Sequence, residues 1–311
     1  MSQEQRQALD TLFRTGPLQV DGDPREQREV FTRMLTSRPL PDDVSLTDGT
    51  LGGVPVLEIT VDGVTPRGTL LWLHGGFYVF GSPRTSAGLA SDVARRTGMR
   101  VLSVDYRLAP EDPYPAALED ALAAYRAMSE ASADSAASAV SAVSGGGELV
   151  VVGESAGGGL AAALLVAARD AGLPLPAAAV LFSPYADLTL SGPSMTGKTA
   201  VDPSFTPSAV RVRARDYVGG ADAADPLISP VFAELRGLPP LLIQAGSHEL
   251  LLDDAVRLAA RAAADDVDVT LDVTAGVPHL FQAFAALLDE GDAALRRVTA
   301  FVADVTGSVP R

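Results

Sequence analysis

Short apolar runs alternate with amphipathic stretches along the chain from residue 54 onward. The apolar runs have the length and composition of β-strands, and the stretches between them carry apolar residues at helical spacing. Strand followed by helix, repeated, is typical of a largely parallel sheet with helices on both faces. The predicted strands are 54–61, 69–73, 100–105, 149–152, 178–182, 241–244 and 267–273, and the predicted helices are 86–96, 115–128, 155–171, 251–264 and 292–305.

Two amphipathic helices are expected ahead of this sheet. Asp23, Pro24 and Glu26 supply a helix cap, a proline at the first helical position and an acidic residue in the first turn. Ser2 with Gln5 forms a second candidate capping box. The apolar face of the second helix is expected to contain Val30, Phe31, Met34 and Leu35.

Two segments depart from the strand–helix alternation. Residues 131–147 are rich in Ala, Ser and Gly, a composition typical of a flexible surface insertion. Residues 187–225 contain turn-forming residues, few apolar anchors and no predicted strand. We therefore expect N-terminal cap helices in 1–45 and one α/β domain in 46–311, with 187–225 inserted as a cap over the sheet edge.

The composition excludes several classes of function. The 311 residues include 24 Lys and Arg against 39 Asp and Glu, which gives a net charge of −15. This acidic balance argues against nucleic acids and anionic membranes as partners, because proteins bind their phosphates with clustered basic residues. The lack of cysteine excludes disulfides, cysteine-bound zinc, iron–sulfur clusters and a thiol nucleophile. The polar N-terminus and the short apolar stretches predict a cytoplasmic protein without a membrane span.

The most informative segment is a buried strand that ends in Gly153-Glu154-Ser155-Ala156-Gly157 and continues into an Ala- and Leu-rich helix. A serine on such a sharp strand-to-helix turn needs small neighbours, because its backbone is strained and adjacent elements approach closely. Its hydroxyl is then exposed at the helix N-terminus. A Gly-x-Ser-x-Gly run also occurs in simple packing turns, but this context predicts a nucleophile elbow with Ser155 as the nucleophile.

Two nucleotide-binding interpretations of the same glycines are disfavoured. A G-x-G-x-x-A match starts at Gly157, beyond the turn, and the following strand ends without a ribose-binding carboxylate. Gly153 and Gly158 have the spacing of a phosphate-binding P-loop, but Gly159 occupies the position that requires Lys. Nucleotide binding is therefore a minor hypothesis.

A second glycine-rich strand end lies upstream, where the strand 69–73 continues into His74-Gly75-Gly76. Two glycines allow consecutive backbone N–H groups to face a substrate oxygen, and with the N–H of Ala156 they form a candidate oxyanion hole. We interpret His74 as a structural residue that fixes the loop. The aromatic residues considered for the substrate pocket, with plain core as the alternative, are Phe77, Tyr78 and Tyr185.

The small number of histidines narrows the search for a general base. His279 follows the last predicted strand, at the edge where this arrangement requires the base. Glu249, which follows the strand 241–244, is the best candidate for the acid that orients His279. The order Ser155, Glu249, His279 is that of α/β hydrolases, not that of chymotrypsin or subtilisin. The three histidines are His74, His248 and His279.

Two neighbouring acids leave the choice of the orienting residue open. Asp253 and Asp254 fit an acidic helix N-terminus stabilised by the helix dipole, although either is an alternative to Glu249. A metal site of His248, Glu249 and Asp253 is disfavoured, because the spacing matches no known metal-binding pattern.

These residues together resemble the bacterial hormone-sensitive-lipase-like esterases, a branch of the α/β-hydrolase superfamily. The similarity extends from about residue 69 to residue 284 and keeps the order of the family's motifs. The motifs that carry the resemblance are His74-Gly75-Gly76, Asp105-Tyr106-Arg107-Leu108-Ala109-Pro110-Glu111, Pro115-Ala116-Ala117, Gly153-Glu154-Ser155-Ala156-Gly157-Gly158, Asp225-Pro226-Leu227-Ile228-Ser229-Pro230 and Pro278-His279.

The resemblance implies an α/β-hydrolase fold, with a mostly parallel central sheet, flanking helices and a helical cap. It also implies hydrolysis of a small-molecule carboxylic ester without metal or organic cofactor, and a homodimer formed through the last strand and helix. Tyr106, Arg107 and Glu111 look structural in the family, in agreement with a buried ion-pair turn.

Three positions depart from the family pattern. Phe77 replaces the third glycine of a His-Gly-Gly-Gly motif, which leaves the two donors Gly75 and Gly76 but reshapes the pocket. Glu154 stands where Asp is frequent, and Glu249 stands where many relatives carry Asp.

We therefore expect a serine carboxylesterase that hydrolyses short- to medium-chain esters through an acyl-enzyme on Ser155, with His279 as the base. A lactone hydrolase is an alternative, because the same nucleophile and oxyanion hole open cyclic esters. A ligand-binding relative without turnover is a further alternative, although such proteins usually lack a member of the triad.

Overall fold

In the part of the chain that the structure describes, eight strands form one sheet in the order β1-β2-β4-β3-β5-β6-β7-β8. The pairs β1–β2 and β2–β4 are antiparallel, and all other neighbouring pairs are parallel. The computed structural model describes residues 3–133 and 148–307. The strands are β1 (Val44–Leu51), β2 (Val54–Val61), β3 (Gly68–Leu73), β4 (Arg100–Val104), β5 (Glu148–Glu154), β6 (Ala178–Phe182), β7 (Leu241–Gly246) and β8 (Val269–Thr274).

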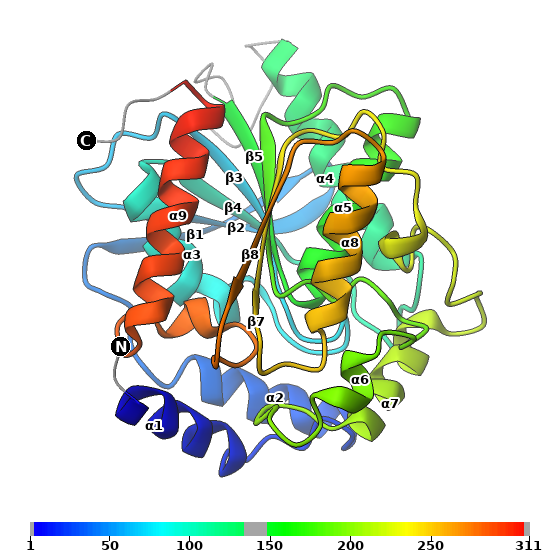
Figure 1. Cartoon of the computed structure of the whole chain (residues 1–311). Helices are drawn as coiled ribbons and strands as arrows, with labels where there is room; N and C mark the ends of the chain where they lie inside the picture. The colour runs from blue at the N-terminus through cyan, green and yellow to red at the C-terminus, as the bar shows by residue number, and fades with distance from the viewer. Residues whose placement is uncertain (1–2, 134–147, 308–311) are drawn as a thin grey trace.

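Helices cover both faces of this sheet (Figure 1). Helices α3 and α9 pack against each other on one face, and α4, α5 and α8 lie on the other. The three-layer architecture predicted from the strand–helix alternation is thereby confirmed. The helices of these layers are α3 (Pro83–Thr97), α4 (Ala116–Ala133), α5 (Ala156–Asp170), α8 (Leu252–Ala264) and α9 (Asp289–Val305).

The central strands divide their side chains between two apolar cores. In β3, Leu71 and Leu73 join the core under α4, α5 and α8, whereas Leu70 and Trp72 join the core under α3 and α9. Successive side chains of a strand point to opposite faces, so a strand buried on both faces is apolar at every position. The turn predicted to be a nucleophile elbow follows one of these doubly buried strands, which holds it in a fixed position.

The sheet begins earlier in the chain than the hydrophobic pattern indicated, because β1 was not predicted. Its side chains are mostly exposed or half-buried and many are polar, so this edge strand carries little apolar signal. Gly52 and Gly53 have φ values of 60° and 84° and form the two-residue turn to β2. The expected domain boundary at residue 46 falls inside β1.

Four further helices gather at the end of the sheet where the parallel strands finish (Figure 1). Two come from the N-terminus, and two come from the segment 187–225 that was expected to form a cap. They are α1 (Gln3–Arg14), α2 (Pro24–Leu35), α6 (Ser194–Gly197) and α7 (Pro207–Val218). Short 3₁₀ turns, η2 (Pro230–Phe232) and η3 (Phe281–Phe284), follow α7 and β8.

Helix α2 is held by its cap and by one arginine. Asp23 accepts hydrogen bonds from the first backbone N–H groups of the helix, as the sequence predicted. Arg28 donates from Nε to the carbonyl oxygen of Val79 and from Nη2 to that of Ala109, each at 2.7 Å. Leu35 was expected on the apolar face but is 43% exposed at the C-terminal end of the helix. The capping residue expected for α1 lies outside the described residues.

Other expectations concern the surface. Residues 131–133 form the end of α4, and the remainder of the expected flexible insertion, 134–147, lies outside the described residues.

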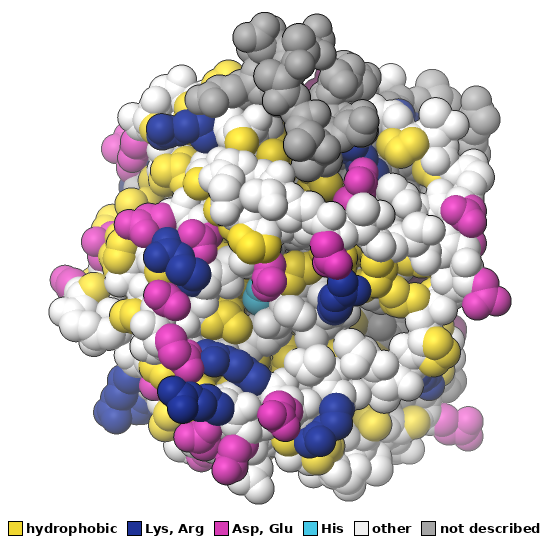
Figure 2. Space-filling model, turned by 180° about the vertical axis from the view of Figure 1, so that it is seen from behind, with side chains coloured by type: hydrophobic (Ala, Val, Ile, Leu, Met, Phe, Trp, Pro, Cys, Tyr) yellow, Lys and Arg dark blue, Asp and Glu magenta, His cyan; other side chains and the backbone are white. Residues whose placement is uncertain are grey.

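Within the ranges 3–133 and 148–307, no helix has the length and apolarity needed to cross a membrane. Figure 2 shows that Lys and Arg side chains on one face lie among Asp and Glu side chains, without a separate basic patch on that face.

Candidate active site

The turn between β5 and α5 presents Ser155 in a strained backbone conformation. Its φ and ψ are 54° and −118°, a region that residues with a Cβ atom rarely adopt. A Cβ atom on Gly157 would lie 2.0 Å from the carbonyl oxygen of Leu73, and one on Gly153 would lie 2.1 Å from that of Gly157. Only glycine fits these positions, so the Gly-x-Ser-x-Gly spacing follows from the close approach of strand and helix.

Ser155, His279 and Glu249 lie in one series of hydrogen-bond contacts. Ser155 Oγ lies 2.9 Å from His279 Nε2, and His279 Nδ1 lies 2.5 Å from Glu249 Oε2. All three side chains are buried. Each comes from a loop at the same end of the sheet, so the topology brings together residues that are 124 and 30 positions apart in the chain.

Additional hydrogen bonds fix the carboxylate of Glu249. Its Oε1 accepts the backbone N–H of Gly246 at 2.7 Å and the hydroxyl of Ser183 at 3.2 Å. With Oε1 occupied, Oε2 faces the imidazole of His279. A carboxylate at Nδ1 keeps the proton on that nitrogen, so Nε2 faces Ser155 as an acceptor.

Asp253 and Asp254, the two alternatives to Glu249, accept hydrogen bonds from backbone N–H groups in the segment that follows β6. Asp253 Oδ2 accepts the N–H of Ser194 at 2.6 Å, and Asp254 Oδ2 accepts the N–H of Asp187 at 2.8 Å. Burial raises the pKa of Asp254 well above its ordinary value. The structure therefore places Glu249, and neither of these aspartates, against His279.

The glycine loop after β3 offers backbone N–H groups beside the elbow. The N–H of Gly75 is directed at Oε1 of Glu154, 3.4 Å away. No hydrogen bond within the described part of the chain occupies the N–H groups of Gly76, Phe77 or Ala156. Gly76 and Phe77 have φ values of 121° and 59°, so the backbone turns sharply at these two residues. The N–H of Phe77 was not anticipated from the sequence, because nothing in the motif reveals its positive φ.

His74 is buried beneath this loop. Its Nδ1 lies 2.9 Å from the carbonyl oxygen of Gly75, and its ring stacks on Tyr106 with centroids 4.1 Å apart. Burial lowers the pKa of His74 to about 4, so the ring is neutral near pH 7. Its Nε2 has no hydrogen-bond partner among the residues that the structure describes. These contacts agree with a structural role in the loop.

Aromatic rings surround the candidate triad. Phe77 meets Tyr185 edge-on at 5.9 Å and Phe205 at 4.8 Å between ring centroids. Phe205 also meets the ring of His279 edge-on at 5.0 Å. Tyr78 instead stacks on a tyrosine of α7 at 3.7 Å and is fully buried. Phe77 and Tyr185 thus belong to the aromatic group at the site, while Tyr78 packs between the glycine loop and α7.

Glu154, which precedes the nucleophile, is a buried carboxylate that links three elements. Its Oε1 accepts the hydroxyl of Ser86 from α3, and Trp72 Nε1 and Gly75 N each lie 3.4 Å from the same oxygen. Burial raises the pKa of Glu154, and these donors oppose that shift. The sequence pattern does not indicate this role, because all three partners lie about 70 to 80 positions upstream.

The ion pair expected in the turn 105–111 does not form. Arg107 pairs with Asp120 at 2.9 Å and Glu119 at 3.0 Å, and Glu111 pairs with Arg28 at 2.6 Å. The side chains of Arg107 and Glu111 are 46% and 39% exposed, so the prediction of a buried ion-pair turn was wrong. The fold brings α4 and α2 close to the turn, and these helices supply better-placed partners.

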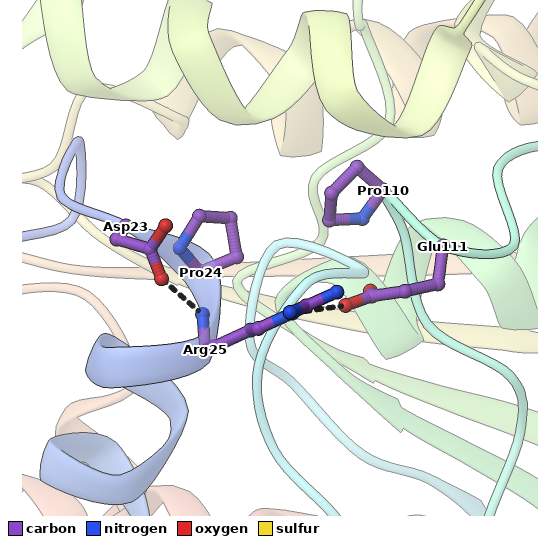
Figure 3. A pocket seen from close by; sticks show the side chains of 5 residues that line it. All are labelled: Asp23, Pro24, Arg25, Pro110 and Glu111. Atoms are coloured by element: carbon purple, nitrogen blue, oxygen red, sulfur yellow. Dashed lines mark hydrogen bonds and ion pairs between the residues drawn. The ribbon is translucent and has the colours of Figure 1, made fainter.

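A surface pocket lies between the start of α2 and the turn at residues 110–111 (Figure 3). Arg25 extends from α2 toward Glu111, and the closest nitrogen–oxygen distance is 3.7 Å. The residues of the candidate triad do not line this pocket. Among residues 3–133 and 148–307, no group of three or more His, Asp and Glu side chains is placed to hold a metal ion. The pocket is lined by Asp23, Pro24, Arg25, Pro110 and Glu111.

Known proteins resemble this chain in sequence and in fold. A family model described as the alpha/beta hydrolase fold matches residues 70–283. The chain is 42% identical to an acetyl-hydrolase of Streptomyces hygroscopicus over 77% of this chain and 76% of that protein. It is 32% identical to an esterase of Acinetobacter venetianus over 94% of this chain and 93% of that protein.

A solved structure extends the match to nearly the whole chain. It is the crystal structure of an esterase from the bacterial hormone-sensitive lipase family, with a TM-score of 0.90 and 40% sequence identity, and the match covers 98% of this chain and 99% of that one. The resemblance that the motifs indicated is therefore confirmed. The chain belongs to the α/β-hydrolase family and, within it, to the bacterial hormone-sensitive-lipase-like branch.

Proposed function

We propose that this carboxylic-ester hydrolase cleaves short- to medium-chain esters through an acyl-enzyme on Ser155. The observation that carries the proposal is the series of contacts from Ser155 through His279 to Glu249. In this arrangement His279 Nε2 accepts the proton of Ser155 as Oγ attacks the ester carbonyl carbon. Glu249 keeps the ring oriented and stabilises the imidazolium that forms.

The tetrahedral intermediate carries negative charge on the former carbonyl oxygen. The unoccupied N–H groups of Gly76, Phe77 and Ala156 support an oxyanion hole at this point. Ala156 lies at the N-terminus of α5, where the helix dipole also favours negative charge. The N–H of Gly75 is directed at Glu154, so we assign Gly75 to holding the loop in place of the donor role expected for it.

Collapse of the intermediate releases the alcohol. His279 donates the proton taken from Ser155 to the leaving alkoxide oxygen, and the acyl group stays on Ser155 Oγ. Water then enters, His279 accepts one of its protons, and the resulting oxygen nucleophile attacks the acyl carbonyl. The bond to Oγ breaks, the carboxylic acid leaves, and Ser155 recovers its proton from His279.

The aromatic surroundings support a preference for small acyl groups. Phe77 occupies a position where the family motif has glycine, and its buried ring meets Tyr185 at 5.9 Å. Such rings take up volume that a long acyl chain would need. The similarity to an acetyl-hydrolase supports the same preference.

Hydrolysis of p-nitrophenyl esters from acetate to palmitate, with wild type beside Ser155→Ala, tests the proposal. We expect rates that peak at short or medium chains and no turnover by a folded Ser155→Ala variant. Turnover by that variant near the wild-type rate would rule out Ser155 as the nucleophile. If the wild-type protein hydrolyses none of these esters but hydrolyses lactones, the lactone-hydrolase alternative replaces the proposed function.

We further propose that α1, α2 and residues 187–225 form a cap over the active site. Arg28 ties α2 to the loop that follows Gly76, through the carbonyl oxygen of Val79. Phe205, from the segment between α6 and α7, reaches the ring of His279. Both cap segments therefore contact the parts of the domain that carry the proposed chemistry.

A homodimer through the last strand is also proposed. In the described sheet β8 has β7 on one side and an open edge on the other. Leu271 and Val273 of β8 are 37% and 41% exposed. An edge strand with exposed apolar side chains is suited to pairing with a second copy of the same chain.

A further inference from the structure

One aromatic residue of the proposed cap lies directly against the base of the proposed triad. The ring of Phe205 stands edge-on to the imidazole of His279, with centroids 5.0 Å apart and planes at 66°. The same ring meets Phe77 of the glycine loop at 4.8 Å and 77°. Phe205 is only half-buried, although it contacts both of these rings.

A buried carboxylate fixes the turn that carries Phe205. Asp202 Oδ1 accepts the backbone N–H groups of Ser204 at 2.6 Å and of Phe205 at 3.1 Å. Asp202 Oδ2 accepts the N–H of Leu250 at 2.7 Å. Leu250 follows Glu249, so Asp202 joins the turn to the loop that holds the triad acid. The ring of Phe205 is therefore held in place relative to His279, as a side chain that sets specificity must be.

The chemistry of the proposed reaction identifies the part of the substrate that meets Phe205. His279 Nε2 must donate a proton to the leaving alkoxide, so the alcohol oxygen lies next to the imidazole when the intermediate collapses. The carbonyl oxygen instead lies in the proposed oxyanion hole, at the N–H groups of Gly76, Phe77 and Ala156. The group attached to the alcohol oxygen therefore extends past the ring that covers His279, which is that of Phe205.

We propose that Phe205 selects the alcohol half of the ester, and that the preferred alcohols carry an aromatic ring. This inference rests on the proposed esterase mechanism. Phe205 and Phe77 already pack edge to face, and a third ring extends such a cluster with the same geometry. A saturated ring of similar size fills the space but lacks the edge-to-face attraction, so the two kinds of alcohol are distinguished by aromaticity and not by volume.

Competing hydrolysis of benzyl acetate and cyclohexylmethyl acetate measures this preference. Each kcat/KM is divided by the rate constant of alkaline hydrolysis of the same ester, which removes the difference in intrinsic reactivity. We expect the corrected ratio to favour benzyl acetate in wild type and to fall about two- to tenfold in Phe205→Leu, mainly through KM. Phe205→Tyr, which retains a ring, should keep the ratio.

A matched control is Phe232→Leu, because Phe232 is a partly exposed phenylalanine that lies over Arg257 of α8. This variant should keep the wild-type ratio and rate. A corrected ratio that favours neither ester in wild type, or one unchanged in Phe205→Leu, would overturn the inference about Phe205. Equal slowing of both esters in Phe205→Leu would also overturn it, by assigning the ring a purely structural role.

The same samples separate this inference from the proposed function. Labelling of Ser155 by an organophosphorus ester and turnover of p-nitrophenyl acetate test the mechanism independently of the alcohol. If both occur and the ratio does not respond to Phe205→Leu, only the role of Phe205 fails. If wild type shows neither, the esterase mechanism itself fails and the role of Phe205 fails with it.

Discussion

Ser183 Oγ lies 3.2 Å from Glu249 Oε1, and this contact ties the end of β6 to the acid of the proposed triad. The same hydroxyl accepts the backbone N–H of Leu280, the residue after His279, at 3.3 Å. Ser183 therefore stands between the loop of the acid and the loop of the base. Its position keeps Glu249 and His279 at a fixed separation.

Replacing Ser183 with alanine should weaken this positioning without removing a reacting group. We expect Ser183→Ala to lower kcat about tenfold with little change in KM, in line with about 1 to 2 kcal/mol for loss of the hydrogen bond to the carboxylate of Glu249. Steady-state kinetics with p-nitrophenyl acetate provide both constants. A kcat equal to that of wild type would show that Gly246 alone is sufficient to hold Glu249.

Glu249→Gln should have a much larger effect. An amide in place of the carboxylate favours the wrong imidazole tautomer, and the analogous change in a known serine hydrolase lowers kcat about 10⁴-fold. Asp253→Asn is the matched control, because Asp253 faces the N–H of Ser194 and not the imidazole. Comparable kcat losses in both variants would contradict the assignment of Glu249.

Gly157→Ala should destabilise the fold strongly. The new Cβ atom would lie 2.0 Å from the carbonyl oxygen of Leu73, so β3 and α5 would have to separate. We expect a loss of at least about 3 kcal/mol, at the upper end of overpacking effects. Gly88→Ala is the control, since nothing lies within 4 Å of its Cβ position in α3, and it should stabilise by about 0.5 to 1 kcal/mol. Urea unfolding compares the two, and equal stabilities would contradict the prediction.

The buried His74 makes folding stability depend on pH. Burial lowers its pKa to about 4 from the 6.5 expected in the unfolded chain. Between these two pKa values the unfolded state binds more protons than the folded state. The free energy of unfolding therefore rises by about 3 kcal/mol as the pH increases from 4 to 6.5, and the contribution of His74 is constant at higher pH. In urea titrations, His74→Asn should lose less stability than wild type between pH 6.5 and 4.5. An identical loss would assign the acid sensitivity to other groups.

The proposed dimer depends on an apolar edge. Val273→Lys places a charge on the exposed edge of β8, and we expect it to convert a dimer into a monomer while ester hydrolysis persists. Light scattering after size-exclusion chromatography gives the mass of both forms. A wild type that is monomeric at micromolar concentration would refute the interface.

The core layers were predictable because their signals are local. The strand that ends at Glu154 is apolar at most positions, since both of its faces are buried, and the small residues after it leave few alternatives to a sharp turn. The edge strand β1 escaped prediction for the opposite reason, because its exposed positions can be polar. Burial on both faces thus decides how clearly a strand shows in the sequence.

Contacts across the fold were less predictable. Phe205 lies in a segment without periodic pattern, and its partner His279 is distant in the chain. The partners of Arg107 depend on where α4 docks, so reading the local turn alone suggested the wrong ion pair. Residue types at strand ends pointed to Ser155, whereas the side chains around it are set by tertiary packing.

The strained backbone of Ser155 lowers the thermal stability of the folded protein, and this strain remains as long as the serine is retained. A φ of 54° with a ψ of −118° is a conformation that glycine adopts with ease, so Ser155→Gly should raise the melting temperature while it removes the proposed nucleophile. A screen for heat resistance alone would therefore favour loss of the hydroxyl. Thermostable descendants that still turn over substrate must gain their stability at other positions and retain this strain.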